Sequence, residues 1–323
     1  CAVCYMKDIA NDDLVAEVKY RLNNLDIDSI ISSGQLEQLI EDNSKCSLPQ
    51  MLSTERPDKA ANHLLSGRVV VIVNGSPYVL IMPCVFVDFL SSAEDPNLKF
   101  QYANLLKFVR LVAFFITLLL PGLYVAITNF HQEIIPTELL FAIVASRESV
   151  PFPIIVEILA MEISFELIRE ASLRVPSPIG TTIGIIGALI LGQAAVEASI
   201  VSPILIIIVA ITGITSFAIP DFYLSFHLRI VRFLYIIAGF LAGFLGIGIV
   251  LFSHLVLLCS LKSFGVSYLA PFVPATSKNN KAYFMPPFWN REKRPDFLNT
   301  KRPQKEARIS MKWKYKIGGN NGN

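Results

Sequence analysis

Four long stretches without a charged side chain limit most strongly how this chain can fold. No Asp, Glu, Lys or Arg occurs in residues 111–130, 175–196, 198–220 or 233–261. One helix needs about 20 predominantly apolar residues to cross a bilayer core. Buried helices of soluble proteins usually keep a polar stripe, and 53% of the chain is hydrophobic against 17% charged. The four stretches therefore predict transmembrane helices rather than the core of a soluble protein.

Charge divides the chain into three parts. Residues 1–98 contain 7 basic and 14 acidic residues, residues 99–277 contain 9 of each, and residues 278–323 contain 12 basic and 3 acidic residues. We predict a cytoplasmic α/β domain in 1–98, a helical transmembrane domain in 99–277 and a basic cytoplasmic tail in 278–323. The tail has the charge to bind nucleic acid, but beside a membrane domain we expect it to lie near anionic lipid headgroups.

The first 98 residues carry the patterns of a small α/β domain. Residues 11–25 place apolar side chains on one helical face behind an Asp cap, and residues 34–42 repeat this pattern more briefly. Residues 68–73 and 78–82 are rich in β-branched side chains and flank Asn74-Gly75. That turn pair tolerates positive φ and predicts a β-hairpin.

The cysteines and histidines give no sign of a cofactor, a metal site or an active site. Cys1 and Cys4 form a C-x-x-C on a strand-like segment, where positions i and i+3 face opposite ways, and no second pair follows. The four histidines are dispersed and no catalytic constellation occurs, so we do not expect an enzyme. Because the chain begins with Cys1 rather than Met, we expect a truncated N-terminus.

A segment in the membrane region, residues 151–173, is unusually acidic. At 100° per residue, Glu162, Glu166, Arg169 and Glu170 gather on one side, where Glu166 and Arg169 are one turn apart and can pair. Glu157 points elsewhere. One interpretation is an amphipathic helix at the membrane interface with a wet polar face. The other is an acidic surface that faces other subunits or an aqueous vestibule, because carboxylates at membrane depth need water or partners.

The apolar run after this segment has two distinct edges. Small residues recur every four positions and predict close helix packing: Gly180, Gly184, Ala188 and Gly192. Polar side chains lie roughly opposite: Thr182, Gln193 and Glu197. In a ring of identical subunits the polar edge would face the axis and line a cation path. Alternatively, Gln193 and Glu197 bond a neighbouring helix of the same subunit, or Glu197 lies at the outer interface.

Basic residues orient the membrane region. Lys99, Lys107 and Arg110 precede the first span, which places the N-terminal domain inside. Two later pairs of arginines mark returns to the inner face: Arg169 with Arg174, and Arg229 with Arg232. The last uncharged run, residues 233–261, contains four glycines, and a single crossing would put the basic tail outside. We therefore expect this run to fold back at the glycines, with an even number of crossings.

Several segments together resemble one family over nearly the whole chain. They are TERPDK, GRVVVIVNGSPYVLIMP, LPGLYVAI, PFPIIVEILAMEISFELIREASLRVPSPIG, ILGQAAVEASIVSP and SFGVSYLAPFVP. This chain resembles the A-subunit family of bacterial spore germinant receptors, the GerA-type membrane proteins. The resemblance implies a multi-pass protein of the spore inner membrane that works with a transporter-like B subunit and a lipoprotein C subunit. It also implies a homo-oligomeric ring, of five subunits.

Three classes of function follow from these patterns. A ligand-linked cation channel subunit explains the polar edge, the small-residue edge and the N-terminal domain, and it is the interpretation we favour. A secondary transporter would need repeated halves with paired broken helices, which the sequence does not show. A non-conducting scaffold for the receptor complex would leave the membrane carboxylates incidental.

Overall fold

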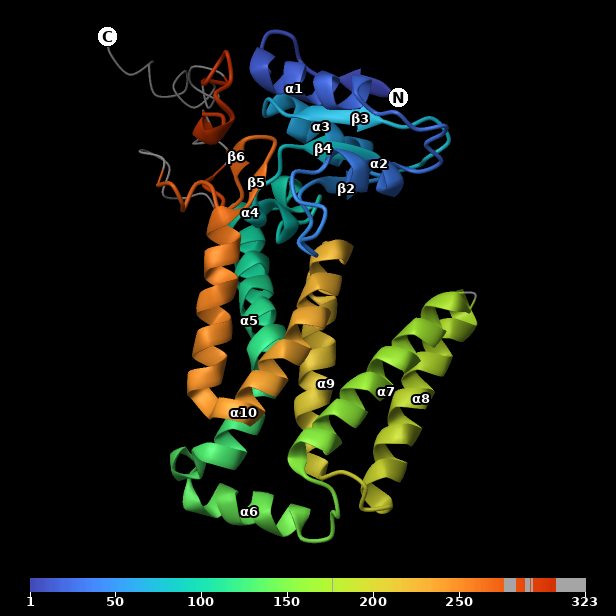
Figure 1. The fold of residues 1–323 in the computed structure, drawn as a ribbon, viewed down its shortest axis with the longest axis vertical. Helices are drawn as coiled ribbons and strands as arrows, with labels where there is room; N and C mark the ends of the chain where they lie inside the picture. The colour runs from blue at the N-terminus through green and yellow to red at the C-terminus, as the bar shows by residue number, and fades with distance from the viewer. Residues whose placement is uncertain (176, 276–282, 288–290, 292, 306–323) are drawn as a thin grey trace, which may run out of the picture. The chain divides into compact units, whose positions relative to one another are not determined.

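Two compact units make up the computed structural model (Figure 1). The first comprises Cys1–Val109 and Val256–Asn323, and the second comprises Arg110–Leu255. The structure describes residues 1–175, 177–275, 283–287, 291 and 293–305, without the side chains of 177–183, 185, 186 and 188.

A four-stranded antiparallel sheet organises the first unit. Its strands are β1 (Ala2–Cys4), β2 (Leu52–Thr54), β3 (Val69–Ile72) and β4 (Val79–Met82), in the order β1-β3-β4-β2. The expected hairpin is confirmed, because β3 and β4 pair antiparallel. Its turn needs Gly75, which has φ +85°.

Short helices pack against this sheet: α1 (Asp12–Asn23), α2 (Ser33–Ile40) and α3 (Pro57–Leu65). The helix α4 (Phe86–Phe89) and the 3-10 turn η1 (Asp95–Asn97) follow the last strand of the sheet in the chain. The two predicted helices are present as α1 and α2. The side chain that caps α1 is Asn11 rather than an Asp, since its oxygen accepts from the backbone N–H of Asp13 at 3.0 Å. Val18 and Leu36 from these helices are fully buried against sheet residues.

Residues far along the chain complete the first unit. Strands β5 (Lys262–Ser263) and β6 (Val266–Ser267) form a two-residue hairpin, and the 3-10 turn η4 (Asp296–Leu298) follows. Phe264, at φ +49°, belongs to the same buried cluster as the α1 and α2 core. In the described part of the predicted tail, Lys301 Nζ pairs with Asp12 at 2.6 Å. The division into three regions stays a prediction.

The second unit is helical. It is built from α5 (Phe100–Phe130, from Arg110 onward), η2 (Gln132–Ile134), α6 (Thr137–Arg147), α7 (Ile154–Arg174), α8 (Ser177–Glu197), α9 (Pro203–Phe217) and α10 (Phe222–Ser260, as far as Leu255). Figure 1 shows α7 and α8 as an antiparallel pair. An apolar cluster that includes Val125, Ile158, Leu205 and Ile236 joins α5, α7, α9 and α10.

Two helices of the described chain are long and apolar enough to cross a membrane, α5 and α10. The apolar helix α9 has only 15 residues, and much of α8 falls outside the described side chains. The structure therefore shows a mostly helical chain with two candidate spans and a small N-terminal sheet. The four crossings expected from residues 111–130, 175–196, 198–220 and 233–261 stay a prediction.

The last long helix, α10, folds back on itself. Ala242 and Gly243 have non-helical dihedrals, with φ +58° and ψ −138° at Gly243. Figure 1 shows the two halves of α10 running in opposite directions from this bend. A side chain at Gly243 would also lie 2.9 Å from His131 Cε1, so both the turn and the space require glycine. The fold-back that the glycines predict is present.

Candidate functional site

A buried ion pair joins α7 to α10 within the helical unit. Glu162 Oε2 lies 2.7 Å from Arg232 Nη2, and both side chains are fully buried. Arg232 is among the largest fully buried side chains of the described chain. Charges removed from water in this way are stable only when they are paired. This pair therefore fixes where α7 and α10 meet.

Glu166, one turn further along α7, bridges three arginines. Its carboxylate lies 3.0 Å from Arg229 Nη1, 3.2 Å from Arg232 Nη2 and 3.7 Å from Arg169 Nη1. Arg169 also donates from Nη2 to Ser216 Oγ of α9 at 2.7 Å. Two carboxylates, three guanidinium groups and one hydroxyl thus hold α7, α9 and α10 together. We call these six residues the charge cluster: Glu162, Glu166, Arg169, Ser216, Arg229 and Arg232.

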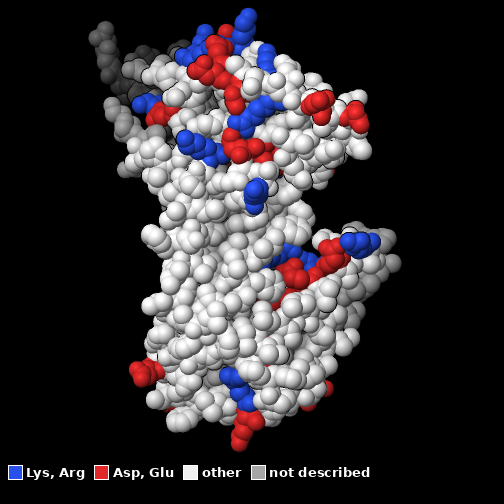
Figure 2. Space-filling model, in the orientation of Figure 1, with Lys and Arg blue, Asp and Glu red and all other residues white. Residues whose placement is uncertain are grey.

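Helical spacing explains how the cluster assembles. The intervals of four and three residues place Glu162, Glu166 and Arg169 on one face of α7, as the sequence predicts. The interval of three residues places Arg229 and Arg232 together on α10. The predicted pair of Glu166 and Arg169 is present, although at 3.7 Å it is looser than the pairs to α10. Figure 2 shows the helical unit as largely uncharged, with its charged side chains gathered in a few places.

Helices of the same chain surround part of this acidic face. Glu162 and Arg169 are buried by them. Glu166 keeps 26% of its side chain accessible, and Glu170 keeps 54%. The helix α10 supplies arginines 63 and 66 residues after Glu166, which no local pattern reveals. A role at an interface or vestibule stays a prediction.

Glu157 lies apart from the charge cluster, as its helical position predicts. Its Oε1 accepts from Arg147 Nη2 at 2.9 Å, and its Oε2 accepts from the backbone N–H of Ser202 at 3.2 Å. Ser202 is the N-cap residue of α9, where a negative charge is stabilised by free backbone N–H groups. Glu157 of α7 therefore links the end of α6 to the start of α9.

The small-residue edge of α8 packs inside the chain where it is described. A Cβ at Gly184 would lie 3.4 Å from Ser172 Cβ of α7, and one at Gly192 would lie 3.8 Å from Ile206 of α9. Gly180 and Ala188 fall outside the part of α8 whose surroundings are described. The sequence does not reveal that these contacts are made within one subunit. Packing of the ridge between subunits stays a prediction.

The polar edge of α8 is open. Gln193 and Glu197 are exposed, and neither side chain bonds another residue in the described ranges. Thr182 falls outside the described side chains. This exposure is consistent with a pore-lining edge and with an interfacial position, and it gives no support to bonding within the subunit. The ion path through these residues stays a prediction.

Nothing in the described residues forms a metal centre. No group of three or more His, Cys, Asp or Glu side chains in these ranges is placed to hold a metal ion. The most concentrated chemistry in the helical unit is therefore the charge cluster, which can clamp helices, and the open polar edge of α8, which can meet ions or water.

Comparison with known proteins places the chain in a family. Residues 1–297 match the family described as "Bacillus/Clostridium GerA spore germination protein". The chain belongs to the GerA family. It is 48% identical over 299 residues to spore germination protein KA of Bacillus subtilis, covering 92% of this chain and 55% of that protein. No solved structure gave a significant match.

Two further relatives support this assignment. Spore germination protein GerLA of Bacillus cereus is 41% identical over 92% of this chain and 61% of its own length. A Bacillus subtilis protein named "Uncharacterized membrane protein YfkQ" is 39% identical over 95% of this chain and 60% of its own length. This GerA-family chain thus spans little more than half of the relatives it matches.

One close contact in this GerA-family chain was not predicted from its sequence. A Cβ at Gly122 of α5 would lie 2.7 Å from the carbonyl oxygen of Tyr235 in α10, and one at Gly239 would lie 2.5 Å from the carbonyl oxygen of Gly122. The two backbones therefore touch where α5 and α10 cross, in the manner of small-residue contacts between membrane helices. The glycines are 117 positions apart, so no sequence period marks them.

Proposed function

We propose that this chain is a membrane subunit of a nutrient germinant receptor in bacterial spores and that it oligomerises into a ligand-linked cation channel. The match of residues 1–297 to the GerA family carries this proposal. Two apolar helices and a relative named as a membrane protein support a membrane location. The proposal places the chain in the spore inner membrane, crossing it several times, with a transporter-like B subunit and a lipoprotein C subunit as partners.

The proposed ion path runs along the polar edge of α8. Gln193 and Glu197 are four residues apart, exposed and without a partner among the described residues. A carboxylate in an apolar helix needs water or a counter-charge. In a ring of subunits, for which we propose five, Glu197 would meet water at the axis and concentrate cations at the mouth of the pore. Thr182 would lie on the same path.

Ion flux from liposomes tests this proposal. We expect Glu197→Gln to lower cation selectivity or conductance and Glu197→Lys to nearly abolish cation flux, because the charge of the ring is reversed. The matched control is Glu170→Gln, which removes a second exposed carboxylate, one that pairs with Arg174 on α7. Each variant is compared at equal amounts of assembled protein.

The same measurement separates the alternative functions. Normal flux and selectivity in Glu197→Lys would move the pore away from α8. Absence of flux from an intact wild-type oligomer would favour a non-conducting scaffold. Flux that required a counter-transported solute would favour a secondary transporter.

A further inference from the structure

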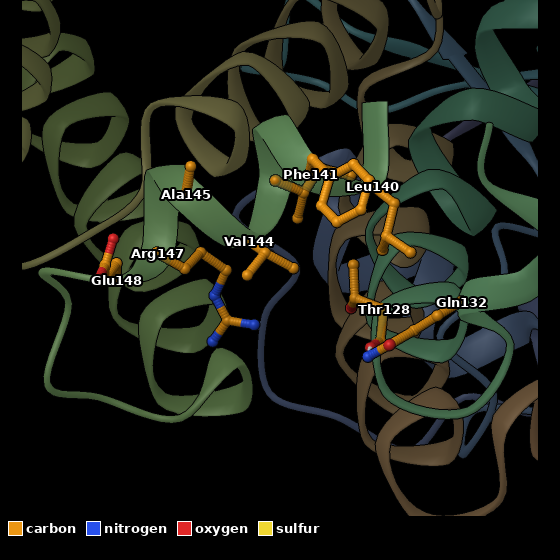
Figure 3. A pocket seen from close by; sticks show the side chains of 9 residues that line it. Thr128, Gln132, Leu140, Phe141, Val144, Ala145, Arg147 and Glu148 are labelled. Atoms are coloured by element: carbon orange, nitrogen blue, oxygen red, sulfur yellow. Dashed lines mark hydrogen bonds between the residues drawn. The ribbon is translucent and has the colours of Figure 1, made fainter. Parts of the chain in front are cut away.

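A cavity of about 670 Å³ lies between α6 and the end of α5 in the helical unit (Figure 3). We call it the cavity beneath α6. Thr128 and Gln132 line one end, at the end of α5 and the start of η2. Apolar side chains of α6 form most of the wall: Leu140, Phe141, Ile143, Val144 and Ala145. Ligand sites in proteins commonly have volumes of this size and are mostly apolar, with a few polar groups that orient the ligand.

Arg147 supplies the cation of this cavity. Its side chain points into the cavity in Figure 3, and 26% of it is accessible. Only Nη2 is used, in the 2.9 Å bond to Glu157 that holds the guanidinium in place. Nε is buried and has no hydrogen-bond partner among the described residues, so it does not face the cavity. Nη1 makes no hydrogen bond to a described residue and is the donor left for an oxygen of a ligand.

Glu148 supplies a carboxylate beside this cation. It is exposed, and its side chain bonds nothing in the described ranges. Figure 3 shows Glu148 on one side of Arg147, with Thr128 and Gln132 on the other. A free carboxylate next to a guanidinium complements a headgroup that carries both a phosphate and an ammonium.

The local charge selects between kinds of headgroup. Arg147, Glu157 and Glu148 together carry one net negative charge. Residues 131–153 contain two further acids, Glu133 and Glu138, and no other Lys or Arg. An anionic headgroup would be repelled by these carboxylates, whereas a zwitterionic one satisfies Arg147 and Glu148 at once.

Exposed apolar side chains at the cavity indicate where the ligand comes from. Phe141 and Val144 of the cavity wall are 72% and 57% exposed, and Leu139 beside them is 51% exposed, so the cavity opens between large apolar side chains. Contiguous exposed apolar side chains mark surfaces that meet a membrane or another protein. The cavity beneath α6 is therefore supplied from the bilayer.

We infer that the cavity beneath α6 binds a phospholipid with an ethanolamine headgroup. The phosphate accepts hydrogen bonds from Arg147, the ammonium pairs with Glu148, and an acyl chain lies along Leu140 and Val144. This inference rests on the membrane location of the proposed function, but on no property of the ion path.

Competition between two lipids tests the inference. The full chain, delipidated in detergent, is mixed with equal amounts of phosphatidylethanolamine and phosphatidylglycerol, and bound lipids are counted by native mass spectrometry. We expect phosphatidylethanolamine to be preferred, and Glu148→Gln to lower that preference by about two- to fivefold, the worth of one exposed ion pair. Arg147→Gln and Val144→Trp should lower the binding of both lipids. The control is Glu170→Gln, which removes an exposed carboxylate of α7 that neither lines the cavity nor belongs to residues 131–153.

Each outcome decides the inference. An unchanged lipid preference in Glu148→Gln overturns it, whatever Arg147→Gln does to folding. Displacement of bound lipid by free leucine, a soluble apolar zwitterion, overturns it in favour of a water-borne ligand. Alkaline extraction of the chain from vesicles is measured alongside. Release would contradict the membrane location itself, whereas retention with an unchanged preference contradicts the lipid site alone.

Discussion

Removing Arg232 should destabilise the helical unit more than removing any exposed charge. Arg232 is the ion-pair partner of Glu162 among the described residues, and both side chains are fully buried. The change Arg232→Gln leaves Glu162 as a buried carboxylate without its ion-pair partner. Breaking a buried pair from one side costs about 3–5 kcal/mol.

The structure predicts an asymmetry between the two partners. After Glu162→Gln, Arg232 still has Glu166 at 3.2 Å. The loss is then closer to that of one charged hydrogen bond, about 1.5–3 kcal/mol. In the double variant neither charge is stranded, so its cost should fall below the sum of the two single costs by about 0.5–3 kcal/mol.

Unfolding of the full chain in mixed micelles, with rising SDS fraction, measures these differences. The control is Arg174→Gln, which breaks an exposed pair on the same helix, where 79% of the Arg174 side chain is accessible. Such pairs are worth less than about 1 kcal/mol. Equal effects of Arg232→Gln and Arg174→Gln would refute the role given to the charge cluster. Additive costs in the double variant would show that Glu162 and Arg232 do not interact.

Three further changes test other parts of the structure. Gly122→Ala should cost about 1–3 kcal/mol in the same unfolding assay because the backbones of α5 and α10 touch there, whereas Gly248→Ala, with no atom nearby, should not destabilise. Phe264→Ala should cost about 3–5 kcal/mol by emptying a core position, seen as faster amide exchange in β3 and β4. Burial and the neighbouring charge of Asp42 raise the pKa of Glu41 to about 7. Because the folded chain holds this proton more tightly than the unfolded chain, the contribution of Glu41 to stability is complete below the pKa that Glu41 has in the unfolded chain. The contribution is lost as the pH rises through 7. Glu41→Gln should therefore raise the melting temperature at pH 8 and not at pH 5; an equal gain at both would contradict the shift.

Local patterns were enough to predict much of the N-terminal domain. The hairpin of β3 and β4 follows from β-branched runs around Asn74-Gly75, and α1 and α2 follow from their apolar periods. These features depend on residues a few positions apart. Phe264 could not be placed in the same way, because its contact with the α1 and α2 core depends on packing across more than 200 positions.

The same limit applies to the candidate site. The face of α7 that carries Glu162 and Glu166 was predicted, but its partners Arg229 and Arg232 were considered only as markers of the inner membrane side. A sequence gives no distance between α7 and α10. The spacing of the charged residues along α7 is therefore the same whether they form a wet surface or a buried ion pair. The presence of two arginines three residues apart in an apolar region was the one available signal, since such charges need partners.

This changes what the arginines say about membrane orientation. Arg169, Arg229 and Arg232 are buried against carboxylates, so their positions are explained by pairing as well as by a preference for the inner side. The bend at Gly243 is independent of charge. At 1.5 Å per residue the halves of α10 before and after it are about 30 Å and about 25 Å long, close to the thickness of a bilayer core. In a membrane, a fold-back of this length would return the chain to the side on which α10 begins, so α10 itself would add an even number of crossings whatever the arginines indicate.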